Sequence, residues 1–239
     1  RGVGGGGPGE AAAWNFWPQF ADATRMGYFL VELLTLILIG SALPREINLG
    51  AVRDPLVRGI SRTTFLAARG VIGLLLPLTL AICAIGASAA AAALWFDAGD
   101  VLEEGAVLIS VSEDALDLHV YKSVLHGLPP LLALGGLALL LSAVCRQAVA
   151  AVGFGFALLL APWFLHDSLG DKAPWIFPNT LAGTGTDSYL ARIAKFAEGY
   201  TDAFPLTFDP VIRIGWIAPW PALVLAWGCA LLLFRKRAA

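Results

Sequence analysis

The sequence predicts an all-α integral membrane protein with five visible transmembrane helices. Hydrophobic residues make up 58% of the 239 residues, mean hydropathy is +0.74, and 14% of the residues are charged, whereas soluble domains carry about a quarter. A bilayer core needs about 20 apolar residues per helix. Continuous apolar runs, rich in Leu and Ala as in helices rather than barrel strands, occur at about 28–43, 71–96, 128–145, 148–165 and 214–234.

The loops between these runs divide into a basic set and an acidic set. Nine Lys and Arg residues against two acidic residues lie in 44–70, 146–147 and 235–239. The remaining segments outside the apolar runs hold seven Lys and Arg residues against fifteen Asp and Glu residues. The positive-inside rule therefore places loop 44–70 and the C-terminus in the cytoplasm of a multi-pass protein of the plasma membrane, the inner membrane in a bacterium.

The remaining segments are predicted to lie outside. Residues 1–27 are expected to form a glycine-rich linker and an interfacial segment, and residues 28–239 a single transmembrane domain. Loop 97–127 is acidic, and loop 166–213 contains "DSYLARIAKFAEGY", which predicts a short amphipathic helix. Because the chain begins without Met, we expect a removed signal sequence or an earlier transmembrane helix.

Loop 44–70 carries the most closely grouped charges of the chain. Apolar residues recur among its arginines, which predicts a broken amphipathic helix along the inner interface, with Pro55 and Gly59 as break points. The plainer alternative is that the arginines set the topology and contact lipid headgroups. Arg69, which adjoins the second apolar run, is most simply interpreted as an interfacial anchor.

The spacing in this loop resembles that of the permease subunits of type 2 ABC transporters (the ABC-2 family, type V exporter-like). Gly50 follows Glu46 by four residues, Arg62 ends "GISR" twelve residues later, and Arg69 follows by seven. Gly59 and Arg69 replace the family's usual Pro and Lys. The segments "LLLSAVCRQAVAAVGFG", "APWIFPN" and "LLLFRKRAA" are similar to family landmarks in the same order, so that the resemblance covers most of residues 28–239.

The resemblance implies a permease subunit of an ATP-driven transporter, expected to be an exporter. Such proteins work as two permease copies, identical or homologous, with two P-loop ATPase subunits that bind ATP and Mg²⁺. Six helices are usual, which favours a helix before Arg1. The implied ATPase-coupling interface consists of Glu46, Gly50, Arg53, Asp54, Arg58 and Arg62.

The chain itself is not expected to be an enzyme. It contains no "GxxxxGK[ST]" phosphate-binding sequence, so we expect ATP hydrolysis on the partner and no cofactor in this chain. Membrane lipid and an external accessory protein are further expected partners, and nucleic acid is not. The substrate is not indicated, because fold-level analogy does not choose among the family's cargoes.

Two further groups of residues invite a functional interpretation. Glu32, inside the first apolar run, is a candidate for a substrate pathway, although it could also reach the outer surface or pair with Arg25. His119, His126 and His166 are expected near the outer face, and the first two, seven residues apart, would share a helix face. They motivate the alternative function, a non-transporting membrane subunit of a redox or metalloenzyme-assembly complex, although no further metal-ligand pattern accompanies them.

Overall fold

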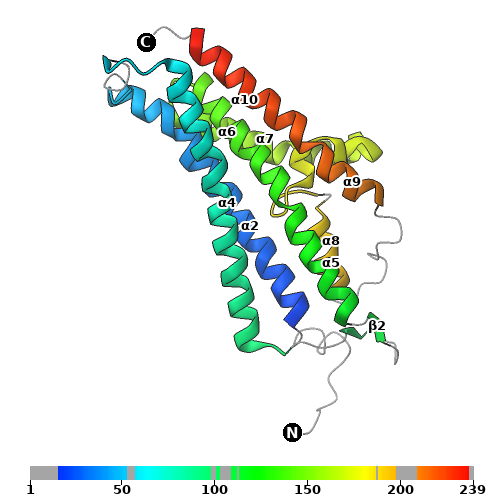
Figure 1. The fold of residues 1–239 in the computed structure, drawn as a ribbon. Helices are drawn as coiled ribbons and strands as arrows, with labels where there is room; N and C mark the ends of the chain where they lie inside the picture. Colours follow the sequence, from blue (N-terminus) through cyan, green and yellow to red (C-terminus); the bar gives the residue numbers. More distant parts are fainter. Residues whose placement is uncertain are drawn as a thin grey trace.

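The computed structural model describes residues 16–52, 57–97, 101–102, 109–111, 113–186, 188–197 and 209–236 (Figure 1). Within these residues the protein is mostly helical. The helices are α2 (Phe16–Asn48), α4 (Arg62–Trp95), α5 (Glu113–His126), α6 (Leu128–Val144), α7 (Ala148–Leu169), α8 (Tyr189–Ala197), α9 (Asp209–Ile217) and α10 (Pro219–Lys236), with 3-10 turns η1 (Gly170–Trp175) and η2 (Phe177–Thr180). A short antiparallel pair, β1 (Val101–Leu102) and β2 (Ile109–Val111), lies between α4 and α5.

Five helical stretches among the described residues are long and apolar enough to cross a membrane, as the sequence predicts. They are Phe16–Asn48, Arg62–Trp95, Asp117–Val144, Ala148–Leu165 and Ile212–Arg235. The helix α2 begins at Phe16, well before the apolar run at 28. The reason is local packing, because Trp17 and Phe20 are buried and the rings of Phe16 and Phe20 stack with centroids 5.5 Å apart.

The helices alternate in direction through the bundle. In Figure 1 the connection from α2 to α4, the turn between α6 and α7 and the end of α10 lie at the end of the bundle near the C-terminus, opposite the N-terminus. We call this the basic end, since its described charged side chains are Arg45, Glu46, Arg58, Arg62, Arg69, Arg146 and Arg235. The two sets of loops inferred from charge are therefore also separated in space.

The helix α6 forms the centre of the bundle and packs against α2, α4, α7 and α10. Two adjacent glycines allow these close approaches. A Cβ atom on Gly135 would collide with the backbone carbonyl oxygen of Gly73 in α4, and one on Gly136 would lie 2.8 Å from a methyl group of Leu223 in α10. Small residues at such crossings let membrane helices pack through their backbones.

The loop 166–213, predicted to lie outside, forms a folded cap over part of its described length. The predicted amphipathic helix is α8, whose Leu190, Ile193 and Ala194 are buried while Lys195 is exposed. This apolar face packs against α2 and α5. The second half of the other long loop, 97–127, is also helical, because α5 continues through Gly127 into α6.

The predicted coupling helix is distributed over three segments. Residues 44–48 complete α2 and residues 62–70 begin α4, so that Glu46 and Arg62 belong to the long helices themselves. Residues 49–52 form a turn, and Arg53, Asp54 and Pro55 lie outside the described residues. Part of the loop expected to form a broken interfacial helix therefore belongs to the two long helices, because the apolar runs on both sides extend as helix into it. The predicted break point Gly59 lies in a turn, and the predicted break point Pro55 lies outside the described residues.

Candidate functional site

Three groups of residues are candidates for function: the basic end, the surroundings of Glu32, and a cleft at the opposite part of the bundle. At the basic end an ion pair joins Glu46, in the last turn of α2, to Arg69 in α4. The guanidinium of Arg69 also lies 5.6 Å from the ring centroid of Phe65. Arg69 therefore connects two helices, a role that its position beside an apolar run does not indicate.

Two glycines and a serine shape the connection between α2 and α4. Gly50 and Gly59 have φ values of +74° and +85°, where residues with a Cβ atom are strained. Ser61 caps α4, since its Oγ accepts a hydrogen bond from the Thr64 N–H at 3.1 Å. Gly59 thus supplies a left-handed turn two residues before the helix cap.

This connection exposes apolar side chains next to a basic one. Leu49, Val57 and Ile60 are 73%, 86% and 44% exposed, and Arg58 is exposed as well. Val52 is buried. We call Leu49, Val57, Arg58 and Ile60 the basic-end tip, and its mixture of apolar surface and positive charge is suited to protein contact.

Glu32 is fully buried in α2 and accepts three hydrogen bonds. Its Oε1 receives the Gly183 N–H at 2.8 Å, and its Oε2 receives the Thr184 N–H at 2.9 Å and the Thr184 hydroxyl at 2.8 Å. Among the described residues it has no ion pair with Arg25. The alternative that Glu32 reaches the outer surface is therefore wrong, because the carboxylate is occupied by a loop from the cap.

The loop 181–186 is held from several sides. A Cβ atom on Gly183 would collide with the backbone of Phe29 in α2, so that only glycine permits this approach. The Trp163 indole N–H of α7 donates to the Thr184 carbonyl at 2.8 Å, and Gly185 N–H donates to Leu181 O at 3.0 Å. The arrangement fastens the cap to α2, whereas a carboxylate lining an open pathway would keep free acceptors.

The third candidate is a cleft between α5, α8 and α9. His119 and His126 share a face of α5, as their spacing predicts, and both contact Tyr189 of α8. His119 Nδ1 lies 2.8 Å from the Tyr189 hydroxyl, and the His126 ring lies 5.2 Å from the rings of both Tyr189 and Trp216. Burial raises the pKa of Tyr189 to about 12, so the phenol stays protonated.

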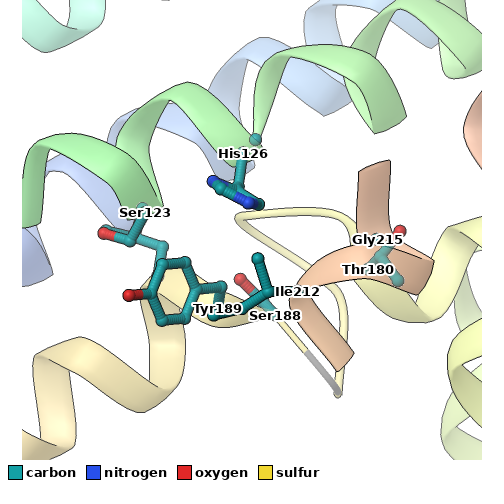
Figure 2. Close-up of a pocket in the computed structure, with 9 residues that line it drawn as sticks. Ser123, His126, Thr180, Ser188, Tyr189, Ile212 and Gly215 are labelled. Carbon is teal, nitrogen blue, oxygen red and sulfur yellow. The ribbon is translucent and has the colours of Figure 1, made fainter. Parts of the chain in front are cut away.

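The cleft has a volume of about 550 Å³, and its other described lining residues are Lys122, Ile212, Arg213, Trp216 and Ile217. A narrow cavity of about 10 Å³ adjoins it and shares His126, Tyr189 and Ile212 with it. Figure 2 shows Ser123 and His126 of α5 facing Tyr189 of α8 and Ile212 of α9 around this cavity. Basic, aromatic and hydroxyl groups thus converge from three helices.

A metal centre receives no support from the described part of the chain. No group of three or more His, Cys, Asp and Glu side chains in it is arranged to hold a metal ion. The side chain of His166 lies outside what the structure describes. His119 and His126 are instead hydrogen-bonded to Tyr189 and to the Lys122 carbonyl, respectively.

Sequence reasoning missed the partners of Glu32 and of the histidines. The stretch "AGTGT" at 182–186 signals a tight turn, but no spacing links it to a glutamate 151 residues earlier. No pattern in the sequence distinguished Tyr189 or Trp216 from the other aromatic residues. No protein-family model matches the chain, and no curated protein is significantly similar to it.

Proposed function

We propose that this chain is the permease subunit of an ATP-driven ABC transporter of type 2, with a separate ATPase subunit bound at the basic end. The observation that carries the proposal is the ion pair between Glu46 and Arg69. These residues begin and end the family-like spacing, and they join the two helices that frame the basic-end tip. Five alternating apolar helices are consistent with such a subunit.

The basic-end tip is the proposed docking element. Its exposed Leu49, Val57 and Ile60 can fill an apolar groove, while Arg58 can form a charge-assisted hydrogen bond with a partner carboxylate. Gly50 and Gly59 set the direction of the connection. ATP and Mg²⁺ are bound by the partner, and this chain contributes the mechanical contact.

The helix α2 would transmit movement at the basic end across the membrane. Glu46 and Glu32 are separated by fourteen residues of one continuous helix, a distance of about 21 Å at the helical rise. At the far point Glu32 holds loop 181–186 of the cap. We infer that displacement of the basic end by the ATPase moves α2 and, through Glu32, the cap.

The exposed apolar faces of α4 and α7 suit either lipid or a second permease copy. Phe154, Trp163 and Phe164 of α7, and Ile72, Leu75 and Ile82 of α4, are all substantially exposed. Such surfaces need covering by lipid or protein. Outward transport, the plasma membrane and a cytoplasmic basic end belong to the same proposal. No observation specifically favours the alternative of a redox or assembly subunit.

The proposal is tested by isolating the chain, through an affinity tag, from the membranes in which it normally occurs. We expect a P-loop ATPase to co-purify and the isolated complex to hydrolyse ATP. The variant Arg58→Glu should lose most of the co-purified ATPase, because it reverses a charge at the docking element. Lys195→Glu, the same reversal on the exposed face of α8, is the matched control and should retain it. Absence of any ATPase from the parent preparation would contradict the proposal.

A further inference from the structure

The cleft between α5, α8 and α9 combines positive charge with an apolar wall. Its volume of about 550 Å³ falls within the range of small-molecule sites, about 300 to 1,000 Å³. Lys122 and Arg213 supply the charge, and Trp216 and Ile217 supply apolar surface. No acidic side chain is among its described lining residues. Such a lining is complementary to a ligand that is anionic at one end and apolar at the other.

The position of the cleft favours a lipid as this ligand. Lys122 lies near the start of the candidate span Asp117–Val144, and Arg213 and Trp216 lie in the first turns of Ile212–Arg235. The ends of spans are at the depth of lipid headgroups, where Trp and basic side chains commonly gather. A phospholipid can therefore reach the cleft sideways from the bilayer.

A buried nitrogen of His126 indicates that the lipid head group must carry a hydrogen-bond donor. The His126 Nδ1–H donates to the Lys122 carbonyl at 2.6 Å, so the neutral ring presents Nε2 as an acceptor. Nε2 is buried and has no hydrogen-bond partner within the described part of the chain. The adjoining cavity of about 10 Å³ has room for about one water molecule or one hydroxyl group. A donor such as a hydroxyl would complete the site.

We propose that this cleft binds an anionic phospholipid whose head group also carries a hydroxyl, as a phosphoglycerol head group does. The phosphate lies between Lys122 and Arg213, and the hydroxyl donates to His126 Nε2. The start of the acyl chains follows Trp216 and Ile217 toward the bilayer. This inference does not depend on the permease function, since it uses no residue of the basic end.

The test is equilibrium binding of short-chain phosphatidylglycerol to the purified full chain in neutral detergent, measured by native mass spectrometry. Phosphatidylcholine tests the need for net negative charge. Phosphatidylmethanol, which is anionic but has no head-group hydroxyl, tests the role of His126. We expect phosphatidylglycerol to bind most tightly and phosphatidylcholine least.

Matched variants make the assignment specific. Lys122→Gln combined with Arg213→Gln should weaken phosphatidylglycerol binding about tenfold or more, because two charge-assisted contacts are lost. Lys172→Gln combined with Lys195→Gln removes the same charge from exposed positions outside the cleft and should leave binding unchanged. His126→Phe retains an aromatic ring and should abolish the preference for phosphatidylglycerol over phosphatidylmethanol.

Three results would overturn the proposal. Equal binding of phosphatidylcholine and phosphatidylglycerol would show that the site does not require an anionic head group. Unchanged phosphatidylglycerol binding in the variant with Lys122→Gln and Arg213→Gln would show that the lipid does not bind in this cleft. Displacement of the lipid by soluble glycerol phosphate at similar concentrations would assign the site to a free anion instead. Because Lys122 and Arg213 are exposed, their replacement by Gln is expected to leave folding intact, which retention of the parent's thermal melting temperature verifies.

Discussion

At the residue scale, the most consequential feature is a buried carboxylate that connects α2 to the loop 181–186 through hydrogen bonds. Glu32 lies in an otherwise apolar helix, and its acceptors are used by two backbone N–H groups and the hydroxyl of Thr184. Burial of such a group is costly unless it is hydrogen-bonded in this way. Its position inside an apolar run marked it as unusual from sequence, but its partners depend on the tertiary fold.

Replacing Glu32 by Gln should destabilise the protein. The amide has one acceptor oxygen instead of two, so at least one buried donor of Gly183 or Thr184 loses its partner, at a cost of about 1–3 kcal/mol. Thermal unfolding in detergent measures the change. Thr184→Val should cost about 1 kcal/mol through the lost hydroxyl, while Thr184→Ser should behave like the parent. Unaltered thermal stability of both Glu32→Gln and Thr184→Val would show that the hydrogen bonds between Glu32 and loop 181–186 do not stabilise the protein.

A single glycine tests the close approach of the cap to α2. Gly183→Ala places a methyl group against the Phe29 backbone, and we expect a loss of about 1–3 kcal/mol in unfolding free energy from the resulting displacement. Gly153→Ala is the control, because it lies in α7 with nothing within 4 Å of the added Cβ. Equal melting temperatures of the two variants would argue against this contact.

At the element scale, the charged connection is part of the helices that it joins. The helix α2 extends to Asn48 and α4 begins at Arg62, because Ser61 caps α4 and Gly50 and Gly59 supply the two turns between. The pairing of Glu46 with Arg69 links the ends of this connection. The family resemblance implied that Glu46 contacts a partner protein, and the position of Arg69 beside an apolar run indicated a lipid anchor. Neither predicted that the two side chains pair with each other.

Exchanging the two charges distinguishes an internal role of Glu46 from an external one. Glu46→Arg alone places like charges together and should reduce ATPase co-purification, whereas Glu46→Arg with Arg69→Glu re-forms the pair and should restore it. The stability change of either variant should be within about 1 kcal/mol, because the pair is partly exposed. If the double variant fails as the single one does, Glu46 contacts the partner directly.

At the scale of the whole molecule, the fold was predictable where composition alone decides it. Continuous Leu- and Ala-rich runs predicted the five helices that are long and apolar enough to cross a membrane, and the sorting of charges into two sets of loops anticipated a basic end. Contacts between distant segments were not predictable, such as Glu32 with loop 181–186 or His126 with Trp216. These contacts depend on which face of each helix is turned toward the bundle interior. Because apolar side chains surround each helix on all sides, the sequence shows no periodic pattern that identifies the inward face.

The proposed function makes the basic-end tip the surface that meets a cytoplasmic ATPase, and the opposite end of the bundle a surface that never does. Val57 at the tip and Leu94 at the far end of α4 are 86% and 80% exposed. They are therefore matched positions for a photo-crosslinking amino acid, differing chiefly in the end of the molecule that they report.

The most direct measurement is crosslinking from these two positions in intact membranes, with the crosslinked proteins identified by mass spectrometry. The proposal predicts that Val57 captures a P-loop ATPase and that Leu94 does not. Capture of lipid alone from Val57, or of the same ATPase equally from Leu94, would contradict the assignment of this chain as the permease of an ABC transporter.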